Sequence, residues 1–532
     1  MWEWIIMYIR KLTRQVILDY GKAEVCTKSG MLRGVISDGT YIFRGVRYSQ
    51  AQRFHMPAPP TPWEGVKEAI TYGNACPEVF TCVPHDQYTV PHYFTVQSED
   101  CQFLNIWTQN IERGVKRPVM VWFHGGGMMT GSGVEHYAYD GEELSKFGDV
   151  VVVTLNHRLN VLGFLDLSAY GEEYRYSGNA GMADLVAALA WIKENIETFG
   201  GDPDKVMIFG QSGGGGKVMS MLQSPRAAGL FHRACLQSGG MRPGNDMTKE
   251  LSGKLAAYVL EYLKIAPEHV RELESVYYDE LARAADYAAG RLYGEEGRPV
   301  MFGPVKDNDF YFGNPFENGF IRETKAVPVL CGSVFGEFMN NFASPVGIGS
   351  KNSWTEKYKK VLLNEEYGEK TEEIINAFQK AYPDKNIADI LFMDVEMRRN
   401  AAAFAGLRAG FTDAGVYNFQ FNLEFPFNGG TVSWHNAEIP YVFHNAEYLE
   451  ASFIPQITPK LQDIMSRAWV NFAENGNPNG CGVPQWTPFG GGKNRTMIFD
   501  RECRMGEDHD LELIRLCPSR TVDFSKLMGS KK

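Results

Sequence analysis

The sequence lacks the features that mark several large classes of proteins. Nine cysteines among 532 residues are too few for a dense disulfide framework, and although eight could pair, reduced buried thiols are favoured. The net charge is −11, and no run of basic residues is longer than pairs such as Lys359-Lys360 and Lys531-Lys532, so nucleic acid is not expected as a partner. No apolar stretch reaches the roughly 18 residues that a membrane-spanning helix needs.

The N-terminal segment does not have the order of a secretory signal. Its apolar run, Trp4–Ile9, has no basic residue before it, and Arg10 and Lys11 follow it. We expect residues 1–21 to form a helical N-terminal extension, either packed on the body of the protein or lying at a membrane interface. Together with the sparse cysteines, this order favours a cytoplasmic protein.

Signatures of nucleotide and metal binding are also missing. In the glycine-rich segment 210–216, a phosphate-binding loop that ends at Lys217 would need glycine at position 211 and a hydroxyl at 218, where Gln211 and Val218 stand. Neither this segment nor 125–133 contains G-x-G-x-x-G, and the chain has no H-E-x-x-H. We therefore expect no cofactor and no metal.

The apolar patterning predicts an α/β fold. Continuous apolar runs at Val119–Phe123 and Val150–Leu155 are typical of parallel strands that are buried on both faces. A helical pattern with one apolar stripe follows over Met182–Phe199 and precedes a short strand at Val206–Phe209. Further strands are expected at Arg233–Gln237, Val327–Cys331 and Val416–Phe421.

Two glycine-rich motifs follow predicted strands and suggest chemistry. Gly210-Gln211-Ser212-Gly213-Gly214 has the G-x-S-x-G pattern of a nucleophile elbow, in which a sharp turn lifts a serine above the sheet. A glycine-rich turn without function is the alternative, since the chain contains 55 glycines. His124-Gly125-Gly126-Gly127 ends an earlier strand, where esterases place the amides that hold an oxyanion. Each such donor stabilises the transition state by about 2.7–4 kcal/mol.

With these motifs the chain resembles the type-B carboxylesterases, the cholinesterase-like branch of the α/β-hydrolases. The other motifs that carry the resemblance are Ser98-Glu99-Asp100-Cys101, Leu104-Asn105-Ile106-Trp107, Asn156-His157-Arg158-Leu159, Gly178–Asp184 and Phe199–Pro203. The likeness runs from about Val25 to about Trp486. It implies an α/β-hydrolase fold, in which a mostly parallel central sheet is flanked by helices. We expect residues 22–532 to form a single domain, with helical insertions at about 246–290 and 351–412 around an active-site gorge.

The resemblance also implies the catalytic groups. The family's nucleophile, acid and base fall on Ser212, Glu337 and His435, in the chain order of the fold. Its oxyanion-hole amides fall on Gly126, Gly127 and Gly213. Glu438 is a competing acid, but its closeness to His435 in the chain suits a local structural role better.

Other positions are assigned on the same basis. Arg158 and Asp184 resemble a structural ion pair of the family. Gln211 stands where many relatives carry Glu, and its side chain is expected to point into the core. Met128 stands where many carry Phe, and with Met129 it adds flexible apolar surface to the pocket.

The predicted activity is hydrolysis of carboxylic esters through an acyl-enzyme, on a small-molecule ester substrate. The loop from Cys76 to Cys101 lacks the Trp that binds choline in cholinesterases, so a choline ester is not expected. These two cysteines match positions that are bridged in secreted relatives, and we expect them to be reduced here. The alternatives are a catalytically silent adhesion protein and a lipase that acts at lipid interfaces. The sequence leaves open whether the protein is a monomer or a homodimer.

Overall fold

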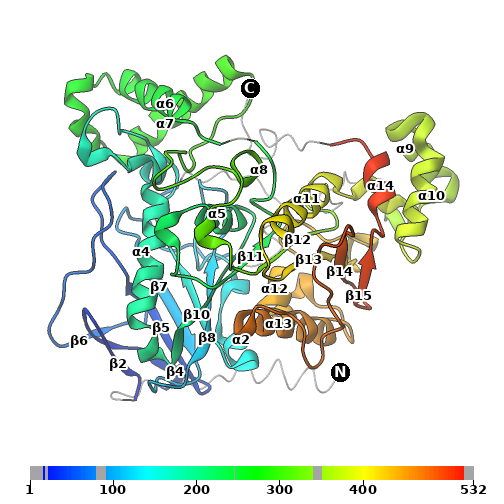
Figure 1. Ribbon diagram of the computed structural model, residues 1–532, viewed down its shortest axis with the longest axis horizontal. Coiled ribbons are helices and arrows are strands. Elements are labelled where there is room, and N and C mark those ends of the chain that lie inside the picture. Colours follow the sequence, from blue (N-terminus) through cyan, green and yellow to red (C-terminus); the bar gives the residue numbers. More distant parts are fainter. Residues whose placement is uncertain (1–15, 18–21, 79–91, 245, 340–349, 521–532) are drawn as a thin grey trace.

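A single large sheet organises the protein. The computed structural model describes residues 16–17, 22–78, 92–244, 246–339 and 350–520, and these residues include a twelve-stranded sheet (Figure 1). In spatial order its strands are β1 (Val16–Ile17), β4 (Val35–Ser37), β5 (Thr40–Arg47), β7 (Phe103–Thr108), β9 (Val151–Leu155), β8 (Arg117–Phe123), β10 (Gly201–Gln211), β11 (Arg233–Gln237), β12 (Val329–Val334), β13 (Val416–Phe421), β14 (Arg495–Phe499) and β15 (Arg504–Glu507). A smaller sheet contains β2 (Glu24–Thr27), β3 (Gly30–Arg33) and β6 (Val66–Glu68).

The centre of the large sheet is parallel and its edges are antiparallel. Every pairing from β9 across to β14 is parallel, whereas the strands outside this span pair antiparallel with their neighbours. This confirms the mostly parallel central sheet that the family resemblance implies.

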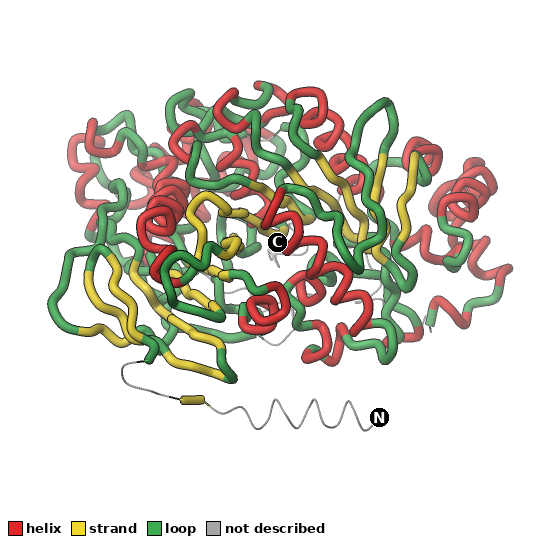
Figure 2. The backbone as a smooth tube through the Cα atoms, turned by 60° about the horizontal axis from the view of Figure 1, so that its bottom comes forward, coloured by secondary structure: helices red, strands yellow, loops and turns green. Residues whose placement is uncertain are grey.

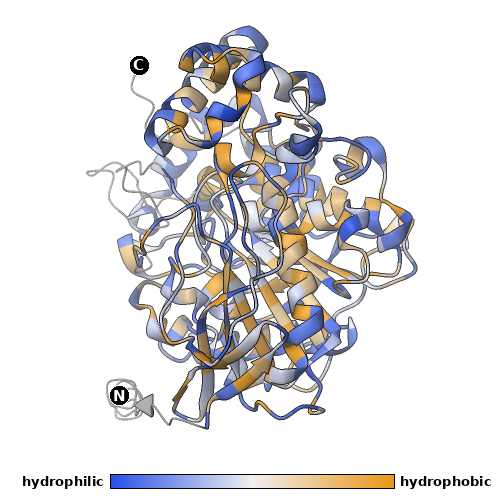
Figure 3. Ribbon diagram, turned by 90° about the vertical axis from the view of Figure 1, so that its left-hand side faces the viewer, coloured by the Kyte–Doolittle hydropathy of each residue, from blue (hydrophilic) through white to orange (hydrophobic). Residues whose placement is uncertain are grey.

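The continuous apolar runs are explained by burial on both faces of the sheet. In β8, Val119, Val121 and Phe123 pack into one hydrophobic cluster, while Met120 and Trp122 pack into another. Because successive side chains of a strand point to opposite faces, a strand covered on both sides needs apolar residues at every position. The hydropathy colouring in Figure 3 shows the apolar strands in the interior and the more polar helix surfaces around them.

Helices cover both faces (Figure 2). They are α2 (Glu142–Gly148), α3 (Asn160–Phe164), α4 (Ala180–Asn195), α5 (Gly213–Leu222), α6 (Lys249–Leu263), α7 (Tyr278–Glu296), α8 (Pro315–Asn318), α9 (Glu356–Tyr367), α10 (Thr371–Ala381), α11 (Val395–Phe411), α12 (Ile439–Val442), α13 (Thr458–Asn475) and α14 (Leu511–Leu516). Helices α4, α5 and α11 pack on the face that carries Val121, and α2 and α13 pack on the face that carries Trp122.

In Figure 1, α6 and α7 of the first predicted helical stretch lie at one end of the molecule and α9 and α10 of the second lie at the other, whereas α11 lies in the body. Residues 246–290 contain α6 and most of α7, which ends at Glu296, beyond the predicted limit. Residues 351–412 contain α9, α10 and α11. Helices α9 and α10 contribute to a separate hydrophobic cluster, which includes Leu363 and Phe378, so this end has a small core of its own.

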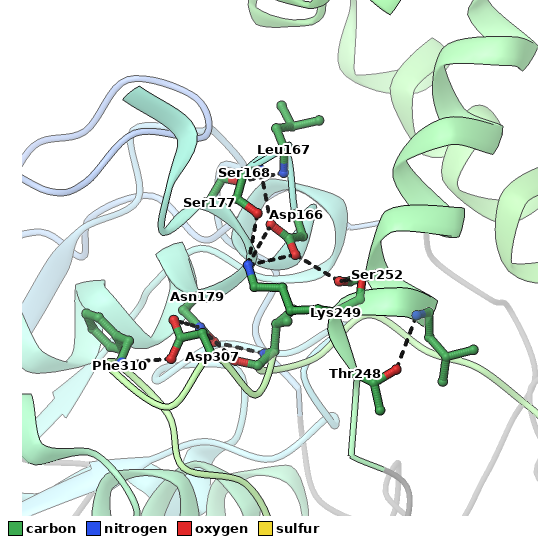
Figure 4. Close-up of polar contacts among 12 residues, drawn as sticks. Asp166, Leu167, Ser168, Ser177, Asn179, Thr248, Lys249, Ser252, Asp307 and Phe310 are labelled. Atoms are coloured by element: carbon green, nitrogen blue, oxygen red, sulfur yellow. Dashed lines mark hydrogen bonds and ion pairs between the residues drawn. The ribbon is translucent and has the colours of Figure 1, made fainter. Parts of the chain in front are cut away.

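Polar contacts attach α6 to the body of the protein (Figure 4). The Nζ atom of Lys249 lies 3.1 Å from the Asp166 carboxylate and 2.9 Å from Ser168 Oγ. Ser252 Oγ donates to the same carboxylate at 2.8 Å. Asp166 is 4% exposed and follows the end of α3. These contacts therefore attach the first turn of α6 to a buried residue just beyond α3.

The N-terminal prediction is wrong where the structure describes it. Val16–Ile17 form strand β1, because their backbone pairs antiparallel with Ile36 and Ser37 of β4. The remaining positions of the predicted helical extension, 1–15 and 18–21, lie outside the described residues.

Candidate active site

Ser212 occupies a sharp turn between β10 and α5. Its backbone has φ 57° and ψ −122°, a conformation that non-glycine residues rarely adopt, and its N–H donates to the carbonyl oxygen of Gln237 at 2.8 Å. Gly214 allows α5 to approach β8, because a Cβ at that position would collide with the carbonyl oxygen of Phe123. The turn leaves Ser212 partly exposed beyond the carboxyl end of the parallel strands, which is the geometry of a nucleophile elbow.

The glycine loop after β8 lies directly beside this turn. A Cβ at Gly213 would collide with backbone atoms of Gly127, and the Cβ atom of Ser212 is close to Gly125. Gly126, Gly127 and Gly213 are all partly exposed. The glycine loop and the Ser212 turn are therefore packed backbone against backbone.

Hydrogen bonds within the loop set the direction of these amides. His124 Nδ1 lies 2.9 Å from the Gly125 carbonyl oxygen, and the Gly126 carbonyl oxygen accepts from Thr130 N at 3.0 Å. In a trans peptide unit the C=O and the following N–H point in opposite directions. Fixing the Gly125 and Gly126 carbonyls therefore fixes where the N–H groups of Gly126 and Gly127 point.

Glu337 and His435 form a buried hydrogen-bonded pair. The His435 Nδ1 atom bonds to Glu337 Oε2, and the side chains are 1% and 0% exposed, respectively. Glu337 Oε1 accepts from Ser238 Oγ at 2.7 Å and from Val334 N at 2.9 Å. These donors favour the carboxylate form, which can only accept, so Nδ1 of His435 carries the proton and Nε2 is left to act as a base.

The loop that carries His435 lies against the elbow. The side chain of Gln211 is buried, as predicted, and its Nε2 donates to the backbone carbonyl oxygen of His435. The ring of Phe338 lies 3.9 Å from the imidazole, measured between centroids. The structure thus joins Glu337 to His435 directly and joins His435 to Ser212 through the neighbouring Gln211.

Two more acids lie near His435. Burial, with the nearby Glu337 charge, raises the pKa of Glu438 to about 8, although a hydrogen bond from Gln237 at 3.1 Å opposes the shift. Burial and the Glu337 charge also raise the pKa of Asp394 to about 7, and Asp394 caps α11 by accepting from Met397 N at 2.9 Å. Both acids are engaged in local structure, which supports Glu337 as the partner of His435.

The predicted structural pair is also present. Arg158 and Asp184 are 2% and 0% exposed, and Arg158 bonds to the carboxylate through Nη2 at 2.7 Å and through Nε at 2.9 Å. Removal of either partner would leave a buried charge without its counter-ion.

Residues that the sequence did not single out also contribute to the site. Ser238 follows β11 just as Ser212 follows β10, so its position at the same sheet edge could have been read from the predicted strands. The positions of Phe338 and Met301 could not have been predicted from the sequence in this way, because these residues reach the site by long-range packing. The Met301 Cε atom lies beside Gly127, and the predicted pocket residue Met128 lies beside Gly216.

The described residues contain no group of three or more His, Cys, Asp or Glu side chains that could hold a metal ion. Within the same residues no helix is both long and apolar enough to cross a membrane. The described cysteines, Cys76 and Cys101 among them, are free thiols.

The fold and this geometry define an α/β-hydrolase, and comparison with known proteins identifies its family. Residues 21–512 match the model of the carboxylesterase family, so the chain belongs to the carboxylesterase family. It is 32% identical to the para-nitrobenzyl esterase of Bacillus subtilis (strain 168), over 92% of this chain and 97% of that protein. It is 30% identical to human carboxylesterase 3, over 88% and 86% of the two chains.

Solved structures agree. The structure described as "An esterase from anaerobic Clostridium hathewayi can hydrolyze aliphatic aromatic polyesters" is 42% identical, with a TM-score of 0.89 over 95% of this chain and 99% of that one. A PNB esterase structure gives a TM-score of 0.72 at 30% identity, over 93% and 99% of the two chains. The protein is a serine hydrolase that cleaves carboxylic esters, as predicted, and neither the silent adhesion protein nor the interfacial lipase is favoured.

Proposed function

We propose that Ser212, Glu337 and His435 are the catalytic triad and that the amides of Gly126, Gly127 and Gly213 form the oxyanion hole. His435 Nε2 removes the proton of Ser212 Oγ, which attacks the ester carbonyl, and the amides hold the oxyanion. His435 then protonates the leaving alcohol and afterwards activates water to release the acid. Glu337 holds the imidazole in its tautomer and stabilises the imidazolium.

The observation that carries this assignment is the buried hydrogen bond between Glu337 and His435, on a loop that Gln211 ties to the elbow. A surface Glu or a satisfied core His would have no reason to converge beside the strained turn at Ser212. Strained backbone at a sheet edge is typical of catalytic positions.

For the substrate, we propose an uncharged small-molecule ester. Support comes from the apolar Met128 and Met301 beside the glycine loop and from the exposed Tyr93 and Phe94 in the described part of the Cys76–Cys101 segment. Aliphatic–aromatic polyesters are a second candidate, favoured by the likeness to the Clostridium hathewayi esterase.

The triad assignment is tested with Ser212→Ala on p-nitrophenyl butyrate and with a fluorophosphonate. The parent should bind one phosphonyl group per chain, and the variant should bind none and lose roughly 10⁶-fold in kcat. Equal rates for the two proteins would rule the assignment out. An acyl-chain series in monomeric and emulsified form, together with acid release from a polyester film, separates the substrate candidates.

We further propose that residues 22–532 act as one catalytic unit and that the protein works in the cytoplasm. The first rests on the continuity of the twelve-stranded sheet, and the second on the free thiols of Cys76 and Cys101. Thiol titration of native and unfolded protein purified from its own cells should count both cysteines as reduced. A bridged pair would contradict the proposed location.

A further inference from the structure

Lys217 is a buried cation close to the elbow that the proposed reaction does not use. It lies on α5, further along the helix from Ser212, and it is 0% exposed. Its Nζ atom donates to the backbone carbonyl oxygen of His124 at 2.8 Å. Burying an ammonium group is costly, so a lysine at this place needs a compensating role.

The bond from Lys217 reaches the base of the oxyanion loop. His124 is the residue between β8 and the glycines, so its carbonyl belongs to the first peptide unit of the loop. The next two units are fixed by His124 Nδ1 on the Gly125 carbonyl and by Thr130 N on the Gly126 carbonyl. Lys217 thus holds the first of three successive peptide units whose directions aim the loop amides.

Two imidazoles lie near the ammonium group. His124 and His157 are 0% and 1% exposed, and their ring centroids are 5.4 Å apart. Burial first, and then the charge of Lys217, hold the pKa of both rings well below the usual range. Among the described residues, His124 Nε2 has no hydrogen-bond partner, and the His157 ring interacts with the backbone of Arg158 and of Gly181. Both rings are therefore neutral near pH 7, and the positive charge of the group resides on Lys217 as long as the pH is below the pKa of that lysine.

Acidic groups face the same site. Gly131 lies against both His124 Nδ1 and Glu135 Oε1, which a Cβ there would approach to 2.9 Å and 3.0 Å. Burial and the charge of Glu78 raise the pKa of Glu135 to about 8. Burial lowers the pKa of Lys217 to about 7, and the charges of Glu135 and Cys76 partly oppose that shift. Arg158 is the other cation that acts on His157.

We propose that Lys217 is a positioning residue for the oxyanion hole: its buried ammonium group holds the His124 carbonyl at the base of the glycine loop and adds positive charge beneath the developing oxyanion. The proposal rests on the assignment of Gly126 and Gly127 as oxyanion donors. Fixed dipoles and charges aimed at a developing charge act mainly on the transition state. Lys217 should therefore affect kcat far more than KM.

The test compares Lys217→Met with Lys351→Met, a matched control. Lys351 is also buried, at 1% exposed, but it pairs with Asp389 and Glu424 in another part of the protein. At a pH below the Lys217 pKa of about 7, we expect K217M to lose about 10- to 100-fold in kcat on p-nitrophenyl butyrate. This is less than the about 10²–10³-fold cost of removing a direct oxyanion donor. KM should stay within two-fold, and K351M should keep its kcat. K217Q, which keeps a neutral donor, serves as a second variant if K217M does not fold.

Fluorophosphonate labelling separates this proposal from the triad assignment. K217M should still bind one phosphonyl group per chain, only more slowly, whereas labelling of S212A would overturn the triad assignment itself. The ratio of parent to K217M kcat should shrink as pH rises and Lys217 loses its charge. A kcat and a phosphonylation rate within two-fold of the parent would overturn the role of Lys217, as would a loss of kcat that K351M shares.

Discussion

Two clusters of buried titratable side chains lie near the elbow that carries Ser212. One cluster is acidic and the other is basic. An acidic cluster (Glu337, Glu438 and Asp394) lies around His435, and a basic cluster (Lys217, His124 and His157) lies under the glycine loop. In the acidic cluster, burial raises the pKa of Glu438 and Asp394. In the basic cluster, it lowers the pKa of both imidazoles. In each cluster one group that specific hydrogen bonds hold in place carries the charge, Glu337 in one and, below its pKa of about 7, Lys217 in the other.

Among changes within the two clusters, the largest effect is expected in the acidic cluster. Glu337→Gln should reduce kcat by about 10⁴-fold, because the imidazole loses both its tautomer control and the charge that stabilises its protonated form. Glu438→Gln, which removes a neighbouring acid, should cost less than about 10-fold. Steady-state kinetics on p-nitrophenyl butyrate measure both. Comparable losses of kcat in the two variants would mean that Glu337 and Glu438 share the negative charge. Glu337 would then have no special role within the acidic cluster.

The acidic cluster should lower stability as pH rises. The folded-state pKa of Glu438 is raised from 4.5 to about 8, so the folded protein holds a proton there that the unfolded chain releases between these values. Its contribution to the free energy of unfolding is full below about pH 4.5 and is lost as pH approaches 8, at about 1.4 kcal/mol per pKa unit. Denaturant titrations from pH 5 to 8.5 should show a decline that is a few kcal/mol smaller in Glu438→Gln. An identical decline in the free energy of unfolding of the parent and of Glu438→Gln would contradict this role of Glu438.

The basic cluster should have the opposite effect on stability, which should increase as pH rises. The pKa of Lys217 is lowered from 10.5 to about 7, so above pH 7 the unfolded chain binds the proton that the folded protein lacks. Stability contributed at this position should rise with pH between about 7 and 10.5. Lys217→Met should lack this rise in the free energy of unfolding. The difference from the parent should be a few kcal/mol, as for Glu438→Gln. Parallel stability curves for parent and variant over this range would argue against it.

The smallest expected effect concerns the support of Glu337. Ser238→Ala removes one donor from its carboxylate, and a lost hydrogen bond to a charged group costs about 1.5–3 kcal/mol. We expect roughly a 10-fold fall in kcat. Ser333→Ala is the control, because Ser333 Oγ is buried on β12 with no hydrogen-bond partner among the described residues. If the two variants behaved alike, the bond from Ser238 would have no part in catalysis.

Local patterns made much of the fold predictable. Strands such as Arg233–Gln237 and Val416–Phe421 fall on their predicted bounds, because apolar runs between helices have few alternatives. The elbow at Ser212 was also readable, since it follows a strand and needs small neighbours. The pairing of Glu337 with His435 was available only through the family resemblance, because no spacing rule joins residues so far apart in the chain.

The rest depends on packing that a linear pattern does not encode. Lys217 was considered only as part of a phosphate loop, since nothing local shows that its ammonium group folds back to the His124 carbonyl. Phe338 and Met301 likewise reach the site from segments with no motif. The apolar run Trp4–Ile9, which favoured a helix, lies outside the described residues, whereas Val16–Ile17, within the same predicted extension, pair with β4 as a strand.

The unusual backbone of two triad residues has a consequence for heat inactivation. Ser212 and Glu337 both adopt positive φ, at 57° and 44°, and such conformations cost about 1–3 kcal/mol each. Only the surrounding contacts hold the backbone in these two conformations. As the temperature rises, we therefore expect the two turns to relax before the rest of the fold unfolds. The temperature at which hydrolysis stops should therefore lie below the temperature at which the sheet melts, and cooling from between the two should restore activity.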